Sequence, residues 1–522
     1  MKNIFNKFTK LFKNDGDFKI GLEDFSDYIK KHSLLIGITI LVILLAHGIN
    51  IFYNNLGIDS QIFVQKPTFD YNWIGLGRFG LLLERDILYL NPFVSYYAGI
   101  LLIVFLILTC SLIYYAFYKI SNKDFGLINL CIPLICFTHP VFAEQFLFKL
   151  QCAEVAFGAF LTSLSMLWLF TWIKNKNFLY AILGMIGLVF SFASYQSFVF
   201  IYITMCIFGF ILLNENDKKE SNFRVILKLI ITFLVSYLIY RFIIKHVFLY
   251  LDFEIGWNSK SLKEIILIIL DHMKNVITGS GPHYNLGFTF GAVLCLIIII
   301  FKIVKDENTI SNKIWYALSF VALLMSPFLL CIVQGGTPLL RSQLALPYAE
   351  AFLVMFSFCY LYKNKYLKYV ALILVFCIVG AQMSSLETLY YTDVFKSEYE
   401  IDLSNKLVYD LKSKGINDEN TIVIIGHLDP PFNELCHPGE IAGVSSYNAN
   451  HEKYPYYMYS TANILGVWRC LGYDYKAGNQ EQTEKARKYL DGKDIPIWPQ
   501  EGSIINLDDF YIVKISNDDL PW

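Results

Sequence analysis

The chain has 522 residues, of which 55% are hydrophobic and 17% aromatic, and its 43 basic side chains nearly balance 44 acidic ones. This apolar content excludes an ordinary soluble globular protein and indicates a multi-spanning membrane protein. The formal net charge of −1 gives no indication of a nucleic-acid partner.

The N-terminal segment 1–33 is mixed in charge and contains no signal-peptide pattern. Lys2, Lys7, Lys10 and Lys13 alternate with isoleucine, leucine and phenylalanine residues. This pattern is typical of a short amphipathic helix on the cytoplasmic membrane face. A frayed basic tail is the alternative.

Apolar runs of about 17–25 residues are typical of membrane-spanning helices, and we count about eleven of them. Together they predict an α-helical polytopic transmembrane domain over residues 34–386. The predicted spans are 34–54, 95–119, 125–139, 150–173, 178–195, 197–213, 225–250, 286–304, 314–333, 345–362 and 368–386.

The orientation follows from lysines and arginines that concentrate in alternate loops. If the N-terminus is cytoplasmic, all of these basic loops share the cytoplasmic side. The opposite loops are richer in acids, histidine, glycine and proline, and the long loop 55–94 is one of them. The basic residues are Lys30, Lys31, Lys119, Lys123, Lys174, Lys176, Lys218, Lys219, Arg224, Lys302, Lys305, Lys313, Lys363, Lys365 and Lys368.

Residues 387–522 are polar and mixed in charge, and an odd number of spans places them outside the cytoplasm. Apolar runs at 421–426 and 510–516 predict strands, and 481–490 predicts a helix. We therefore expect a small C-terminal α/β extracytoplasmic domain.

Nine of the eleven cysteines lie before residue 380 in apolar runs, where cysteine acts as a small hydrophobic residue. No cysteine or histidine spacing indicates a structural zinc site, and we expect no cofactor or metal. Cys436 and Cys470 remain. These two cysteines either form a disulfide in an oxidising compartment or are two independent thiols.

Two acids are candidate catalytic residues. Asp59 follows the first span closely and could remove a proton from a substrate hydroxyl; the alternative is a solvated acid that caps a helix. Glu144 lies beside an apolar run between the third and fourth spans, where a carboxylate is costly unless it is paired or hydrated. Glu154, deeper in the fourth span, is either paired inside the bundle or part of a cavity wall.

Four cations are candidate ligands of a phosphate group. Arg241 and Lys245 are four residues apart and share one helical face, where they could clamp a phosphate or extend towards lipid headgroups. Arg341 lies in a segment broken by glycine and proline, of the kind that lines a cavity. Lys149 follows Glu144 in the same polar segment.

Further polar or aromatic residues are candidates for substrate binding: Trp73, Arg78, His139 and Gln196. His139 marks a turn with the proline that follows it, and Gln196 lies at a polar hairpin tip where turn formation is the simpler explanation. His47, inside the first span, is expected to be a core histidine.

Several motifs in this order resemble the phage-type, serotype-converting O-antigen glucosyltransferases (type II, Gtr-like) of the GT-C class. They are GIDSQ at Asp59, WIGLGR from Trp73 to Arg78, HPVFAEQF, SYQS, PLLRSQLALP and IPIWPQEGSI. Family members often have two adjacent acids after the first span, whereas Ser60 follows Asp59 here. This difference argues against a paired-acid or metal-binding role at that position.

The resemblance implies a membrane glycosyltransferase of a bacterial inner membrane. It implies a polyprenyl-phosphate sugar donor, glucose as the sugar, and a surface polysaccharide such as O-antigen as the acceptor on the outer face. Asp59 would then be the base, Arg341 with Arg241 and Lys245 would stabilise the leaving phosphate, and Glu144 would orient the acceptor or act as the alternative base. A polysaccharide polymerase and a flippase for lipid-linked sugars are the alternatives.

Overall fold

The computed structural model of the chain describes residues 20–53, 60, 70–215, 221–248, 260–281, 283–305, 310–448 and 459–517. Asp59 and the predicted amphipathic segment before residue 20 lie outside these residues. The chain divides into two compact units. Unit 1 comprises Met1–Phe52, Asn72–Gln145 and Gln151–Leu386, and unit 2 comprises Tyr53–Tyr71, Phe146–Leu150 and Glu387–Trp522.

Six helical segments of the described chain are long and apolar enough to cross a membrane, and two bent helix pairs would raise the number to eight. The protein is therefore a mostly helical polytopic membrane protein. The six segments contain α8 (Ser95–Ser121), α10 (Cys152–Asn175), α13 (Asn222–His246), α15 (Gly287–Lys305), α16 (Ile310–Met325) with α17 (Leu329–Gln334), and α19 (Leu367–Ser413).

The predicted count of eleven spans is not confirmed, for two reasons. Two of the predicted spans, 34–54 and 125–139, fall in bent helix pairs: α3 (Ser33–His47) is bent against α2 (Leu22–Lys31), which precedes the predicted span, and Gly126–Cys136 is bent against α9 (Pro140–Phe146). Three others, α11 (Phe178–Ser194), α12 (Phe198–Asn214) and α18 (Ala345–Leu361), have 17 residues each. That length is at the lower limit for a straight span.

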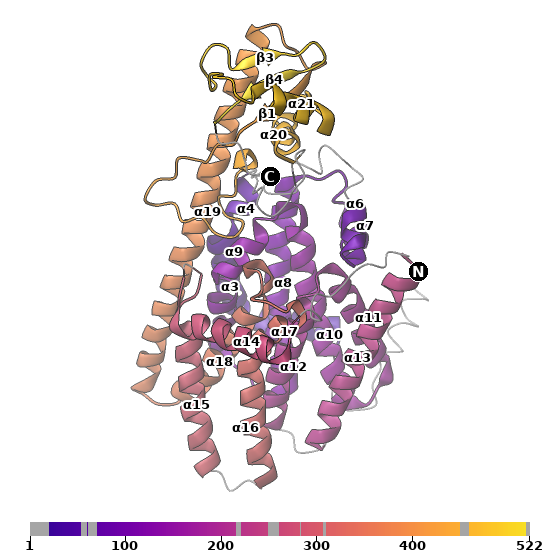
Figure 1. Cartoon of the computed structure of the whole chain (residues 1–522). Helices are drawn as coiled ribbons and strands as arrows, with labels where there is room; N and C mark the ends of the chain where they lie inside the picture. Colours follow the sequence, from indigo (N-terminus) through magenta and orange to yellow (C-terminus); the bar gives the residue numbers. More distant parts are fainter. Residues whose placement is uncertain are drawn as a thin grey trace. The chain divides into compact units, whose positions relative to one another are not determined.

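Helix α14 (Leu262–Thr278) lies where the sequence predicted only a loop. It begins with a capping box, in which the Ser261 hydroxyl and the Glu264 carboxylate satisfy each other's backbone amides. The helix contacts α15 and α17 and runs crosswise to α15 and α16 (Figure 1). Its apolar residues are interrupted by Lys263, Glu264, Asp271 and Lys274, so hydropathy did not predict a span there.

The centre of unit 1 is formed by α8, α10, α11 and α12, and α10 contacts the other three. Small residues allow these helices to approach closely. A Cβ added to Gly184 of α11 would come 2.7 Å from Leu169 of α10, and one added to Gly187 would collide with Ser165. Larger residues at these two positions would force the helices apart.

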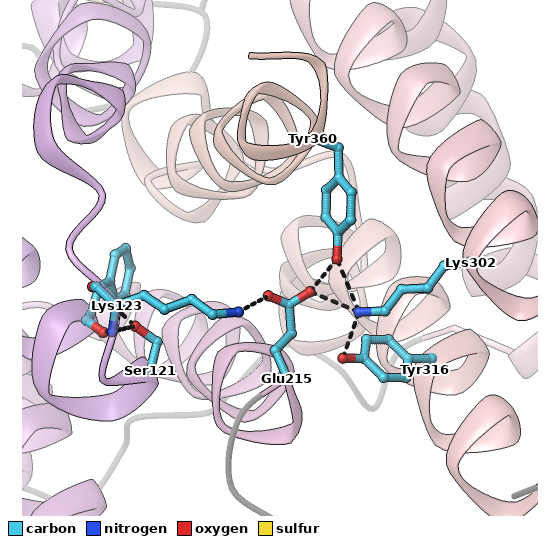
Figure 2. A network of polar contacts seen from close by, with 7 residues as sticks. Ser121, Lys123, Glu215, Lys302, Tyr316 and Tyr360 are labelled. Atoms are coloured by element: carbon cyan, nitrogen blue, oxygen red, sulfur yellow. Dashed lines mark hydrogen bonds and ion pairs between the residues drawn. The ribbon is translucent and has the colours of Figure 1, made fainter. Parts of the chain in front are cut away.

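A polar network joins the C-terminal ends of four helices of unit 1 (Figure 2). Glu215, directly after α12, accepts a hydrogen bond from Lys302 of α15 at 2.8 Å and lies 3.7 Å from Lys123, which follows α8. Tyr360 of α18 donates to the same carboxylate, and Lys302 also contacts the hydroxyl of Tyr316 at 2.9 Å. Two of the predicted basic loops, those of Lys123 and Lys302, thus lie on one side of unit 1.

Unit 2 contains a four-stranded sheet in the order β2-β1-β4-β3. Strand β1 is parallel to β2 and β4, while β3 is antiparallel to β4. Figure 1 shows the sheet with α20 and α21 at the C-terminal end of α19. The elements are β1 (Thr421–Ile425), α20 (Tyr459–Cys470), β2 (Lys476–Ala477), α21 (Gln480–Leu490), β3 (Ile504–Asn506) and β4 (Tyr511–Lys514).

The two predicted strands and the predicted helix are present as β1, β4 and α21, and Trp468 of α20 lies fully buried in the core beneath the sheet. The placement of this region outside the cytoplasm stays a prediction. Cys436 and Cys470 are free thiols, so the structure has the second of the two predicted alternatives and no disulfide.

A buried lysine fixes a loop of unit 2 to α19. Lys396 lies 3.5 Å from Asp393 and 3.9 Å from Glu400, and all three side chains are almost fully buried. Asp393 accepts from the backbone amide of Gly443 at 3.2 Å, and Glu400 accepts from the hydroxyl of Ser445 at 2.8 Å. The charges of α19 therefore order the loop that follows β1.

Replacing Glu215 with glutamine should lower the free energy of unfolding by about 1–3 kcal/mol, because Lys302 loses its charged partner. Burial alone would raise the pKa of Glu215, but the Lys302 ammonium brings it below the usual value. The stabilisation is therefore present at neutral pH and is lost as the pH falls through the lowered folded-state pKa. Thermal unfolding of the detergent-solubilised protein across the acid range measures both effects.

Lys123→Gln is the matched control. The Lys123 side chain is half-exposed and 3.7 Å from Glu215, so its loss should cost no more than about 1 kcal/mol. Equal losses in the two variants would contradict a central role for the Glu215–Lys302 pair.

Candidate functional site

A cluster of buried acids, histidines and amides lies in unit 1. We call it the histidine–glutamate cluster. Its side chains come from five parts of the chain: the turn before α9, α9 itself, the loop before α15, α18 and α19. Its members are Thr138, His139, Glu144, His283, Glu350 and Gln382, all at most 6% exposed.

Glu144 of α9 contacts His283, which lies in the loop before α15. The distance between Glu144 Oε1 and His283 Nε2 is 2.9 Å. Burial lowers the pKa of His283 to about 4, so its imidazole is neutral at pH 7. The contact is thus a hydrogen bond between a neutral imidazole and the Glu144 carboxyl group, and it fixes the orientation of that group. An oriented carboxyl group of this kind suits general base catalysis or the binding of an acceptor hydroxyl.

His139 is fixed by the start of α9. Pro140 is the first residue of that helix, a position that suits proline because no intrahelical partner exists for its missing N–H. The amide of Val141 donates to His139 Nδ1 at 3.2 Å, which places the imidazole proton on Nε2. Nε2 lies 3.8 Å from Glu350 Oε2. The sequence predicted His139 as a site residue but did not predict this acid beside it.

Gln382 of α19 bridges two members of the cluster. Its amide nitrogen donates to Glu350 Oε1 at 2.9 Å, and its carbonyl oxygen accepts from the hydroxyl of Thr138 at 2.8 Å. Sequence reasoning missed Glu350 and Gln382. A signal for Glu350 was present, because a carboxylate inside an apolar run needs a partner or water.

Arg341 lies in the broken segment between α17 and α18, as predicted, and is partly buried. Two residues later, Gln343 accepts from Tyr284 at 2.9 Å, so this segment is joined to the loop that carries His283. Gln343 also donates to the carbonyl of Pro338 at 2.8 Å, which holds the break in shape. A broken backbone with internal partners is the arrangement expected where it lines a site.

The loop 55–94 contributes a second buried charged group through α7 (Phe79–Ile87). Arg85 Nη1 lies 3.0 Å from Glu154 Oε1, with both side chains fully buried. This contact decides between the two predictions for Glu154: it is paired inside the bundle. The neighbouring Glu84 accepts from Ser194, and burial raises the pKa of Glu84 well above its usual value.

The WIGLGR element is joined to the SYQS turn. Arg78 Nε donates to Gln196 Oε1 at 3.3 Å, and its guanidinium lies 4.5 Å from the ring centre of Tyr195. Gln196 in turn donates to the carbonyl of Leu76 at 2.6 Å. The positive φ of Gly77, +73°, lets its carbonyl accept from Tyr240 of α13 at 3.1 Å. Two motifs about 120 residues apart thus form one structural unit.

Of the remaining predicted residues, Trp73 is 3% exposed and its ring lies 5.3 Å from the Arg85 guanidinium. Arg241 is partly buried and Lys245 exposed at the end of α13, while Lys149 is buried in a segment of unit 2. Their phosphate-binding roles stay predictions. His47 is a buried core histidine whose Nε2 contacts the carbonyl of Phe137 at 2.7 Å.

Replacing Arg85 with alanine should destabilise the protein by about 3–5 kcal/mol, because it leaves the Glu154 carboxylate buried without its cation. The double variant Arg85→Met, Glu154→Gln should recover most of this loss, since no charge is then buried. Thermal unfolding in detergent measures both.

The control is Lys31→Ala, which removes an exposed ion pair with Asp124 of the same 3.0 Å length and should cost less than about 1 kcal/mol. A double variant no more stable than Arg85→Ala would show that the cost does not come from the unpaired charge.

A comparison with known protein families matches residues 45–358 to the family Glucosyl transferase GtrII. Comparisons with curated proteins and with solved structures gave no match. The matched region covers more than half of the 522 residues and includes every member of the histidine–glutamate cluster except Gln382. Membership supports a glycosyltransferase role, and it confirms the resemblance drawn from the sequence motifs: this chain belongs to the Glucosyl transferase GtrII family.

Proposed function

We propose that the protein transfers glucose from a polyprenyl-phosphate-linked donor to a surface polysaccharide such as O-antigen, on the outer face of a bacterial inner membrane. The observation that carries this proposal is the buried Glu144–His283 pair beside His139 and Glu350, within the family-matched region of a polytopic membrane protein. It supplies oriented acid and imidazole groups in a water-poor site, where electrostatic effects on a reacting group are strong.

The proposed reaction is a single displacement at the anomeric carbon. The acceptor hydroxyl oxygen forms the new glycosidic bond while the bond from the anomeric carbon to the phosphate oxygen breaks, and the lipid phosphate leaves with the electron pair. Asp59 takes the hydroxyl proton. Attack opposite the leaving group gives inversion.

The other polar groups act on binding and charge. Glu144, held by His283, orients the acceptor and is the alternative base. Arg341 stabilises the negative charge on the leaving phosphate, helped by Arg241 and Lys245. Arg78 and Gln196 join the WIGLGR element to the SYQS turn and to Tyr240 of α13.

Asp59→Asn should lower turnover by several orders of magnitude, because the amide keeps the shape of the side chain but cannot accept the proton. Transfer of labelled sugar from a polyprenyl-phosphate donor in detergent is the assay, with thermal unfolding to show that the variant is folded. Wild-type turnover in Asp59→Asn, together with a large loss in Glu144→Gln, would transfer the role of base to Glu144.

Deleting the protein from its host separates this function from its rivals. The expected result is a surface polysaccharide of normal length that lacks a side-chain sugar. A polysaccharide polymerase would instead be indicated by loss of the polymer, and a flippase by accumulation of the lipid-linked sugar.

The proposed orientation places the N-terminus in the cytoplasm and residues after Leu386 outside. A periplasmically active phosphatase fused after Trp522 should therefore be active, and one inserted within residues 306–309 should be inactive. The opposite pattern would invert the topology and remove the argument for an outward-facing site.

A further inference from the structure

An apolar groove lies in unit 1 between the start of α15 and the first part of α19. Its volume is about 460 Å³, within the range of small-molecule binding sites, about 300–1,000 Å³. Its wall is almost entirely hydrocarbon, and Asn285 lies at one end of it. The groove is lined in part by Asn285, Gly287, Phe290, Ile373, Cys377 and Ile378.

The end of the groove at Asn285 and Gly287 adjoins the histidine–glutamate cluster. Gly287 lies directly against Glu350: a Cβ added there would collide with Glu350 Oε1 and would come 2.9 Å from Ile378 Cγ2. Asn285 Oδ1 accepts from the Gly287 amide at 2.6 Å, which fixes this end of the wall. Only glycine leaves space here between the groove and the acid.

Helix α19 connects the groove with the cluster from the other side. Ile378 lines the groove, and Gln382, four residues later on the same helical face, donates to Glu350. One turn of α19 therefore separates Ile378 in the apolar wall from Gln382, which is hydrogen-bonded to the buried Glu350 carboxyl group. The family match ends at residue 358, so this wall comes from a part of the chain outside it.

The mouth of the groove faces outward with large apolar side chains. Phe290 is 44% exposed and Ile373 64% exposed. Exposure of such large apolar side chains is favourable only in contact with hydrocarbon. A chain in this groove would have its polar end at Asn285 and Gly287, beside Glu350 and His139. A bulk phospholipid has no reaction to undergo there, whereas the donor of a glycosyltransferase must bring its headgroup to the catalytic groups.

We propose that the groove between α15 and α19 holds the headgroup-proximal isoprene units of the polyprenyl-phosphate donor. The proposal rests on the proposed function and adds the location of the lipid chain. Residues of α15 and α19 then determine the specificity for the length of the donor's lipid chain. A different set of groups acts on the sugar.

The test compares donors with a two-isoprene chain and a full-length chain in detergent. Wild-type protein should have the lower KM for the long donor. Cys377→Trp fills the groove and should raise the KM of the long donor by about tenfold, with kcat within about twofold and little change for the short donor. Ile373→Trp is a second groove variant with the same expectation.

Leu372→Trp is the matched control, because Leu372 is an exposed residue of the same helix that does not line the groove. It should keep the wild-type preference for the long donor. Elution profile and thermal unfolding show that each variant is folded. An unchanged chain-length preference in both groove variants would overturn the proposal, as would equal effects of Leu372→Trp.

The outcomes separate this proposal from the proposed function. Sugar transfer by wild-type protein with no chain-length preference, and capture of phospholipid by a photoreactive maleimide on Cys377, would assign the groove to bilayer lipid and leave the glycosyltransferase function intact. Failure of wild-type protein to use a polyprenyl-phosphate donor of either length would refute both.

Discussion

Charged side chains can be buried in this protein only where a partner replaces the water that they lose. The desolvation cost of a lone buried ion is several kcal/mol, of the order of the whole stability of a domain. Arg85 and Glu154, both fully buried, satisfy the condition as a pair at 3.0 Å. Because the pair joins α7 to α10, the constraint also fixes the position of α7.

The same constraint acts at the ends of the helices and in unit 2. Glu215 brings together a lysine and a tyrosine from α15 and α18 (Figure 2), so four helix ends are fixed relative to one another. In unit 2, Lys396 is buried between Asp393 and Glu400, and these acids accept hydrogen bonds from the following loop. At each site, the hydrogen bonds and ion pairs that offset the desolvation cost of the buried charges also connect segments that are distant in the sequence.

The histidine–glutamate cluster meets the same requirement for partners with histidines and an amide. Its groups are buried, and its two acids contact histidines and an amide: Glu144 contacts His283, and Glu350 contacts His139 and Gln382. A carboxylate held by hydrogen bonds keeps more of its capacity to bind a hydroxyl than one neutralised by arginine. These contacts orient the two acids, which is why we propose acceptor binding for the cluster and assign a structural role to the Arg85–Glu154 pair.

Sequence alone determined the membrane class, because runs of apolar residues set the length and polarity of helices, and it found the family through short ordered motifs. It also identified Glu144, His139 and Glu154 as unusual, since the cost of a polar group in an apolar run is a local property. Only the tertiary structure decided their partners. His283, Glu350 and Gln382 are between 32 and 244 residues from the groups they contact, and contacts over such separations depend on how helices pack, which periodicity does not encode. The crosswise α14 and the bent helix pairs were missed for a related reason: hydropathy gives the length of an apolar run but not the direction of its helix.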